Sequence, residues 1–196
     1  MKNSIRIAGG KYKGRALPWT FQDIGITAQK VKEALFSILG NIEKKSFADL
    51  FGGSGQIAFE ALSRGASPVI CIELDRERAG FISSFGVKNF QDSSFMPLNM
   101  SFLQAMRFLS KKGIRPDYIF ADPPYEKGRR GDALYLEIAA AIVKHDLAVD
   151  GSVLIIQHFS KTILPERIEA FHRIKEKKYG STTLSFYEYG SSSSSV

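Results

Sequence analysis

Phe47-Ala48-Asp49-Leu50-Phe51-Gly52-Gly53-Ser54-Gly55-Gln56-Ile57-Ala58 is the stretch that decides the fold of this chain. Its first five residues, apolar except for Asp49, are read as a strand, and residues 52–55 have the composition of a tight turn. The spacing of apolar residues over 56–64 predicts a helix that ends at Gly65. A strand, a glycine turn and a helix in this order begin a βαβ unit.

The same alternation continues along the chain. Asp75 is placed to cap the helix after the second strand, and Thr27 is placed to cap an earlier helix, which Gly40 ends. Strands alternating with helices predict an α/β fold, a doubly wound Rossmann-like sheet that is mostly parallel. After Pro165 the pattern changes to two strands joined by a turn, which predicts an antiparallel C-terminal pair. The expected strands are residues 47–51, 69–74, a segment within 95–103, 118–121, 153–157, 171–178 and 182–189, and the later helices are residues 105–112 and 133–145.

The first residues differ in character from the rest. Residues 5–18 alternate residue types around Gly9-Gly10, which predicts a β-hairpin. At 196 residues the chain has the size of one α/β domain with a small appendage. We therefore expect a basic hairpin extension over residues 1–24, an α/β domain over 25–190 and a disordered serine-rich tail over 191–196.

The glycine turn also carries a ligand-binding pattern. Residues 53–58 satisfy G-x-G-x-x-A, and Glu73 ends the second strand at a spacing suited to hold ribose hydroxyls. These features fit NAD and S-adenosylmethionine equally. Asp49 precedes the glycines, where it would repel a pyrophosphate and suits a cationic cofactor bearing an amino acid, so it favours S-adenosylmethionine. A glycine-rich turn with a purely structural role is the alternative.

Asp122-Pro123-Pro124-Tyr125 follows the apolar run 118–121. The exocyclic amine of a nucleobase is a poor nucleophile because its lone pair is delocalised into the ring. The Asp122 carboxylate and the Pro123 carbonyl can each accept a hydrogen bond from that amine and free the lone pair, while both prolines fix the backbone. Tyr125 offers a ring face to a flipped base. The motif predicts methylation of a base amine, a reaction in which NAD has no role. A proline-rich turn is the simpler alternative.

Basic residues outnumber acidic ones and gather in two places. Lys and Arg number 27 against 20 Asp and Glu, a net charge of +7. One cluster lies in the expected hairpin and the other directly after Tyr125, which favours a nucleic-acid partner over a merely solvated basic surface. The candidate RNA-binding residues are Arg6, Lys11, Lys13, Arg15, Lys127, Arg129 and Arg130.

Other classes of protein are disfavoured. The single cysteine, Cys71, excludes an internal disulfide and a cysteine metal cluster, and the three histidines show no ligand spacing, so we expect no metal. No apolar stretch is long enough to span a bilayer, and no signal core follows the basic N-terminus. We expect a cytoplasmic protein, and a monomer, since no association helix is evident.

At several motifs together the sequence resembles the RsmD-type methyltransferases. The opening Arg6-Ile7-Ala8-Gly9-Gly10-Lys11-Tyr12-Lys13-Gly14-Arg15 is similar to that family's R-I-I-G-G-x-x-(R/K)-G-R. The likeness continues through residues 27–36, 49–66, 122–125 and 179–187, and so covers nearly the whole chain. It implies S-adenosylmethionine-dependent methylation of the 2-amino group of a guanine in bacterial small-subunit (16S) ribosomal RNA, with the small ribosomal subunit as partner.

The resemblance also assigns roles by position. Asp49, Phe51, Gly53 and Gly55 would surround the methionine part of the cofactor, and Glu73 would hold the ribose. Gln104, followed by Ala105, stands where the family has an acid or Asn beside adenine. Gly25-Ile26-Thr27 replaces the family's R-P-T. The full set of expected cofactor-binding residues is Thr27, Asp49, Phe51, Gly53, Gly55, Glu73, Leu74, Gln104 and Ala105.

Two other functions remain open at this point. DNA amino-methyltransferases share the Asp-Pro-Pro-Tyr motif, but those that read a sequence normally carry a separate recognition domain, for which 196 residues leave no room. A non-catalytic, ribosome-associated binding module is the third possibility. The presence of Asp49, Glu73, Asp122 and Tyr125 in one chain argues against it.

Overall fold

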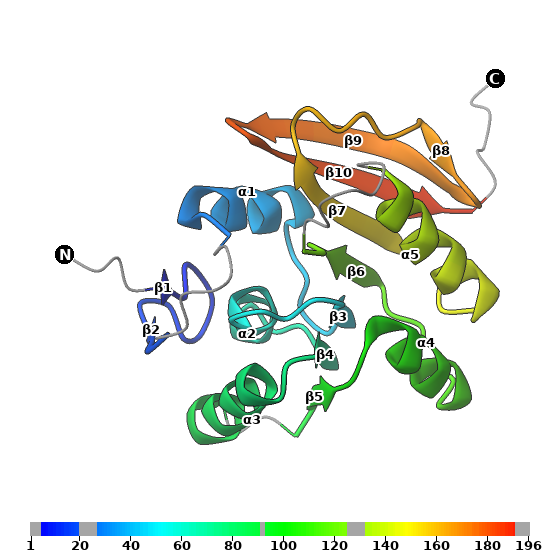
Figure 1. The fold of residues 1–196 in the computed structure, drawn as a ribbon. Helices are drawn as coiled ribbons and strands as arrows, with labels where there is room; N and C mark the ends of the chain where they lie inside the picture. The colour runs from blue at the N-terminus through cyan, green and yellow to red at the C-terminus, as the bar shows by residue number, and fades with distance from the viewer. Residues whose placement is uncertain (1–4, 20–26, 91–92, 125–131, 191–196) are drawn as a thin grey trace. The chain divides into compact units, whose positions relative to one another are not determined.

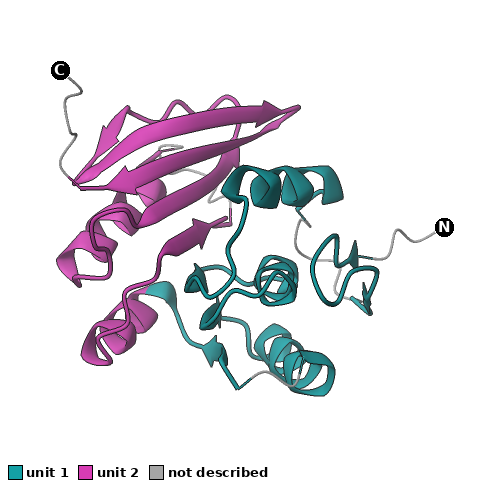
Figure 2. Cartoon of the chain, turned by 180° about the vertical axis from the view of Figure 1, so that it is seen from behind, with its two compact units in different colours: residues 1–102 teal, residues 103–196 magenta. Residues whose placement is uncertain are grey.

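The computed structural model of the chain describes residues 5–19, 27–90, 93–124 and 132–190. The chain divides into two compact units, Met1–Phe102 and Leu103–Val196, drawn in teal and magenta in Figure 2. The expected boundary at residue 24 lies outside the described residues, as does the expected tail at 191–196.

Unit 1 contains three parallel strands with helices between them (Figure 1). β4 (Val69–Glu73) pairs with β3 (Phe47–Asp49) on one side and with β5 (Phe95–Asn99) on the other. All residues of β3 and β4 are buried. The strands are connected through helices, as the sequence predicts. The helices of this unit are α1 (Gln29–Leu39), α2 (Gln56–Ser63) and α3 (Arg76–Phe90).

The core of unit 1 is built around α2, whose residues are all buried. Phe59 stacks on Phe90 of α3 with ring centroids 5.1 Å apart, and is tilted against Phe85 at 5.1 Å and Phe95 at 5.7 Å. Gly86 makes this possible, because a Cβ there would lie 2.4 Å from the Phe95 ring. Burying one phenylalanine contributes about 1.5–3 kcal/mol. The ring cluster therefore fixes how α2 and α3 pack beside β5.

The predicted hairpin is confirmed. β1 (Ile5–Arg6) and β2 (Ala16–Leu17) pair antiparallel. The segment between them packs on the C-terminal end of α2, where the amide of Lys11 donates to the Ser63 carbonyl at 2.7 Å and that of Tyr12 donates to the Ser63 hydroxyl at 2.9 Å. The same hydroxyl donates to the Gly9 carbonyl at 2.6 Å. One serine thus supplies otherwise unpaired loop groups with partners.

A buried ion pair ties the hairpin to α1 and α2. Lys32 Nζ lies 3.5 Å from Glu60 Oε2, and both side chains are fully buried. That oxygen also accepts the Ala8 amide at 2.7 Å, Oε1 accepts Arg64 Nε at 2.8 Å, and Lys32 donates to the Arg6 carbonyl. Burial lowers the pKa of Lys32, while the Glu60 carboxylate acts in the opposite direction. The extra hydrogen bonds offset part of the cost of desolvating both charges.

Unit 2 combines a parallel strand pair with antiparallel C-terminal strands. β6 (Tyr118–Ala121) is parallel to β7 (Val153–Phe159), and β10 (Thr182–Tyr189) is antiparallel to both β7 and β9 (Phe171–Tyr179). The short β8 (Arg167–Ile168) pairs with β9. The helices are α4 (Phe102–Lys111), whose first residue ends unit 1, and α5 (Ala133–Lys144). The predicted α/β class, mostly parallel with an antiparallel C-terminal pair, is confirmed.

Several element boundaries differ from the prediction. The first α1 hydrogen bonds go to the carbonyl of Ala28, which is the N-cap residue, so the prediction that Thr27 caps α1 was wrong. α4 begins at Phe102, earlier than the predicted residue 105. β7 continues to Phe159, because β10 offers Thr182 as a partner there. No helix in the described ranges is long and apolar enough to cross a membrane.

Candidate functional site

The glycine loop of unit 1 leads from the end of β3 into α2. Asp49, 1% exposed, accepts the Phe51 amide on its own carboxylate at 3.3 Å. The Gly52 amide donates to the Ile72 carbonyl at 2.6 Å, which pins the loop to β4. Gly53 and Gly55 have φ of 53° and 75°, left-handed values that favour glycine. The loop thus turns sharply before α2 begins at Gln56.

Two of these glycines are required by the packing of the protein itself. A Cβ on Gly52 would lie 2.7 Å from the Cys71 sulfur, and one on Gly55 would lie 2.7 Å from the Phe59 ring. Both approaches are much shorter than van der Waals contact. Of the glycines in the pattern over residues 53–58, Gly55 is therefore also explained by packing within α2, and the preceding Gly52 is explained by its contact with β4.

Glu73 braces the loop from the end of β4. Its Oε2 accepts the Gly53 amide at 2.7 Å, and its Oε1 accepts the Asp75 amide at 2.8 Å and Arg78 Nη2 at 3.2 Å. Burial raises the pKa of the Cys71 thiol well above its ordinary value, and the negative charges of Asp49 and Glu73 act in the same direction. Asp49 and Glu73 therefore place two carboxylates beside the loop, of which Glu73 is paired with Arg78.

Three residues near the loop were not predicted from the sequence. Asn99, at the end of β5, donates to the carbonyls of both Glu73 and Leu74 at 2.9 Å. Phe102 lies against Phe51, with ring centroids 5.6 Å apart. Arg78 holds Glu73, as described above. Of the three, Asn99 has the clearest signal, because it is a polar residue at the end of a strand. The register of β4 and β5 places it directly beside Glu73.

The remaining predicted cofactor residues have different surroundings. Leu74, which directly follows Glu73, is 69% exposed, so its apolar side chain is open to solvent. Thr27 is buried, and its carbonyl accepts Gln56 Nε2 at 3.2 Å, which ties it to the start of α2. Gln104 and Ala105 lie in the first turn of α4 in unit 2, where Gln104 is exposed and Ala105 is fully buried.

Asp122 directly follows β6 in unit 2. Because Ala121 pairs with Ile156 in the parallel ladder, the next residues, Asp122 and Gln157, lie side by side. Gln157 Nε2 donates to Asp122 Oδ2 at 2.5 Å. Pro123 is buried. The structure thus holds the carboxylate at the carboxyl end of β6, and Gln157 is a partner that the sequence did not predict. Tyr125, Lys127, Arg129 and Arg130 lie outside the described residues.

The basic residues of the hairpin fall into two groups. Arg6, Lys11 and Lys13 are exposed. Arg15 is half-buried, with its guanidinium 4.7 Å from the Tyr12 ring centroid and 5.8 Å from that of Phe90, and it donates to the carbonyl of Asn89 in α3. Arg15 therefore anchors the hairpin to α3.

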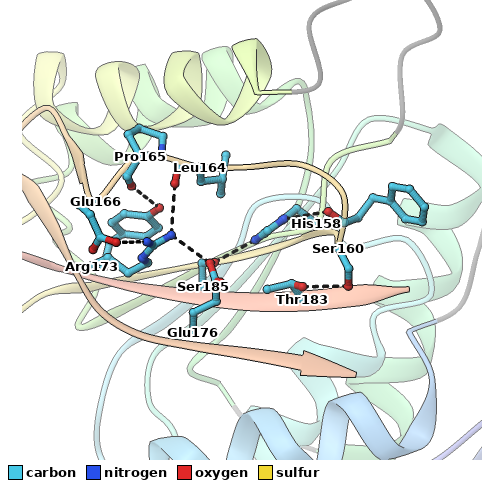
Figure 3. A network of polar contacts seen from close by, with 11 residues as sticks. His158, Ser160, Leu164, Pro165, Glu166, Arg173, Glu176, Thr183 and Ser185 are labelled. Atoms are coloured by element: carbon cyan, nitrogen blue, oxygen red, sulfur yellow. Dashed lines mark hydrogen bonds and ion pairs between the residues drawn. The ribbon is translucent and has the colours of Figure 1, made fainter. Parts of the chain in front are cut away.

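A second polar network in unit 2 connects β7, β9 and β10 (Figure 3). His158 Nε2 lies 2.9 Å from the Ser185 hydroxyl, which is 3.0 Å from Glu176 Oε2, and Arg173 Nη1 donates to that oxygen at 3.0 Å. Burial lowers the pKa of His158, while its hydrogen bond to the Phe159 carbonyl acts against that shift. Since successive residues of a strand face opposite sides, this network lies on the other face of β7 from Gln157.

Within the described ranges, no three His, Cys, Asp or Glu side chains gather as a group that could hold a metal ion. The described polar clusters include the Lys32–Glu60–Arg64 cluster and the carboxylates beside the glycine loop in unit 1 and, in unit 2, the Asp122–Gln157 pair and the network around His158.

Known proteins resemble this chain along most of its length. A family model described as Conserved hypothetical protein 95 matches residues 5–188. An uncharacterized methylase of Rickettsia prowazekii, RP545, is 29% identical over 95% of this chain and 98% of its own length. Ribosomal RNA small subunit methyltransferase D of Escherichia coli is 36% identical, over 63% of this chain and 62% of its own length.

Among solved structures, yhhF from Escherichia coli is 27% identical, with a TM-score of 0.79 and coverage of 95% of this chain and 98% of that one. The fold and the family match agree. The chain therefore belongs to the family described as Conserved hypothetical protein 95, and is a methyltransferase of the RsmD type.

Proposed function

We propose that this protein transfers a methyl group from S-adenosylmethionine to the exocyclic 2-amino group of a guanine in small-subunit ribosomal RNA. The observation that carries the proposal is the Asp122 carboxylate, fixed by Gln157 at the end of β6 and followed by two prolines. A curated relative bears the name ribosomal RNA small subunit methyltransferase D, which supports the choice of substrate.

The glycine loop of unit 1 has groups that fit the proposed cofactor. S-adenosylmethionine supplies an electrophilic methyl group on a positively charged sulfur. Asp49 and Glu73 place carboxylates beside the loop that can attract this charge, although Glu73 is also paired with Arg78. A carboxylate has about four lone-pair sites, and Glu73 already accepts three hydrogen bonds, so about one site is left for a ribose hydroxyl. Leu74, 69% exposed, offers an apolar face to the adenine ring.

Asp122 and Pro123 prepare the nucleophile. The carboxylate of Asp122 and the carbonyl of Pro123 each accept one N–H of the guanine amine, which turns the nitrogen toward tetrahedral geometry and frees its lone pair. The ring of Pro123 fixes its φ, and the following Pro124 restricts its ψ, so the direction of the carbonyl is confined. Catalysis of this kind depends on preorganised position and charge. Tyr125 is proposed to stack on the flipped base.

Exposed basic residues are proposed to dock the RNA. Arg6, Lys11 and Lys13 project from a hairpin that Ser63 and Glu60 hold in place, so their charges are presented on a fixed support. Contacts to phosphates supply affinity that falls with salt. Lys127, Arg129 and Arg130 are included in the proposal for their charge and their place after Tyr125.

The experiment is methyl transfer from labelled S-adenosylmethionine to immature small ribosomal subunits, with duplex DNA as the competing substrate. Label in a guanine of the ribosomal RNA supports the proposal, and label in DNA replaces it with a DNA amino-methyltransferase. Calorimetric titration with S-adenosylmethionine that detects no binding would instead leave a non-catalytic binding module.

A further inference from the structure

The hydrogen bond from Gln157 to Asp122 joins a buried side chain to a half-buried one. Gln157 is 9% exposed, and residues on either side of it in β7, Ile156 and His158, are at most 1% exposed. An amide placed there costs free energy unless it is hydrogen-bonded. An apolar residue would be the ordinary choice for this strand, so the amide at position 157 requires an explanation.

The direction of the hydrogen bond follows from chemistry. An ionised carboxylate only accepts, so the amide must turn its NH₂ group toward Asp122. The two backbones are held in register by the β6–β7 ladder, which makes the donor rigid. A neutral donor also leaves the negative charge of Asp122 in place, whereas Lys or Arg would neutralise it.

We propose that Gln157 is a positioning residue for methyl transfer, which orients the Asp122 carboxylate so that it can accept the substrate amine. This inference rests on the proposed function, since it assigns a role within the same reaction. Gln157 acts through Asp122: by fixing Oδ2, it sets the rotation of the carboxylate and hence the direction of the lone pairs that meet the amine.

A purely structural role would have Asp122 serve only to satisfy a buried amide. The two roles differ in the outcome of Gln157→Glu, which has nearly the same shape. Two carboxyls at this separation cannot both ionise easily, so the pair shares a proton and titrates above the ordinary carboxyl range. While the proton is shared, the introduced carboxyl donates to Asp122 as the amide does. When it is lost, the two charges repel and Asp122 turns away.

The test is kcat for RNA methylation across pH, measured for the full-length protein and its variants. Gln157→Glu is expected to lose activity as pH rises through the titration of the two carboxyls. The pH profile of the unmodified protein should lack this fall in kcat. Gln157→Met is expected to lower kcat about 10-fold to 100-fold, the effect of one hydrogen bond to a charged group, with KM for S-adenosylmethionine unchanged.

The matched control is Gln29, which donates to Glu33 at 2.9 Å on the exposed face of α1. Gln29→Met and Gln29→Glu remove or replace the same kind of hydrogen bond away from Asp122, and both should retain the kcat and pH profile of the unmodified protein. The inference is overturned if Gln157→Met keeps full kcat or if Gln157→Glu shows the unmodified profile. Should Gln157→Met fail to fold, the Gln157→Glu profile alone decides. Absence of methylation by the unmodified protein would instead refute the proposed function.

Discussion

Gly10 lies so close to Ser63 that a Cβ on the glycine would be 1.8 Å from the serine carbonyl oxygen. The φ of Gly10 is 75°, so both its conformation and its surroundings exclude a side chain. The opening motif and the end of α2, separated by some fifty residues of sequence, are therefore shaped to fit each other.

Gly10→Ala should displace the hairpin from α2, because the clash is with backbone that cannot move aside. Gly14→Ala is the matched control: its φ is 87°, but nothing lies within 4 Å of its Cβ position. The control should cost about 1 kcal/mol from backbone strain alone, and Gly10→Ala clearly more. Urea unfolding measures both. Equal losses would show that the hairpin does not depend on this fit.

Lys32→Met should destabilise the protein by about 3–5 kcal/mol, because it leaves the buried Glu60 carboxylate without one of its two cations. Replacing both partners, as Lys32→Met with Glu60→Leu, should recover part of that loss, since neither fully buried charge of the pair then remains and Arg64 is partly exposed to solvent. Denaturant unfolding of the two single variants and the double variant measures the coupling. Strictly additive changes in the free energy of unfolding would contradict the ion pair between Lys32 and Glu60.

The features that could be predicted from the sequence are those set by neighbouring residues. The strand and helix order, the stop at Gly40 and the cap at Asp75, whose carboxylate accepts the Arg78 amide at 2.9 Å, all follow from short-range preferences. The turn between β9 and β10 at Gly180, with φ of 62°, is of the same kind. The prediction for Thr27 was wrong because a threonine can cap a helix only if the helix begins directly after it.

Contacts between distant segments could not be predicted in this way. Gly9-Gly10 was interpreted as a turn, while its fit against Ser63 depends on where α2 ends. Gln157 looks like an ordinary strand residue until the ladder places it beside Asp122. The two-residue β8 has too little sequence for any periodic signal. The sequence therefore identified the candidate residues that belong to a recognisable motif. It did not identify the residues that hydrogen-bond to those candidates and hold them in place.

Stability should fall as pH decreases through the ordinary pKa of histidine. Burial lowers the pKa of His158 in the folded state, so the unfolded chain takes up a proton at a higher pH, about 6.5, than the folded one does. Protonation of the unfolded chain then favours unfolding until pH falls below the folded pKa. The free energy of unfolding should therefore rise with pH up to about the ordinary histidine pKa of 6.5, and more weakly in His158→Gln. His145→Gln, a change at the C-cap of α5, serves as control. A slope unchanged by His158→Gln would contradict the assignment.

Cys71 should report on occupation of the glycine loop. The thiol is 1% exposed with a raised pKa, so reagents reach it only when the structure opens. It also packs against Gly52, so ligand bound at the loop should slow that opening by about 100-fold at a concentration one hundred times its Kd. Thiol modification rates with and without S-adenosylmethionine measure this. A rate independent of the cofactor would place its site elsewhere.

Asp122 tests the central claim most directly. The measurement is nucleoside mass spectrometry of small-subunit ribosomal RNA after single-turnover methylation by the unmodified protein and by Asp122→Ala, with cofactor affinity followed by calorimetry. We expect a methyl group on the 2-amino group of a guanine, formed about 100-fold or more slowly by Asp122→Ala although it binds S-adenosylmethionine normally. An Asp122→Ala protein that methylates at the full rate, or a product methylated at another atom, would contradict the account.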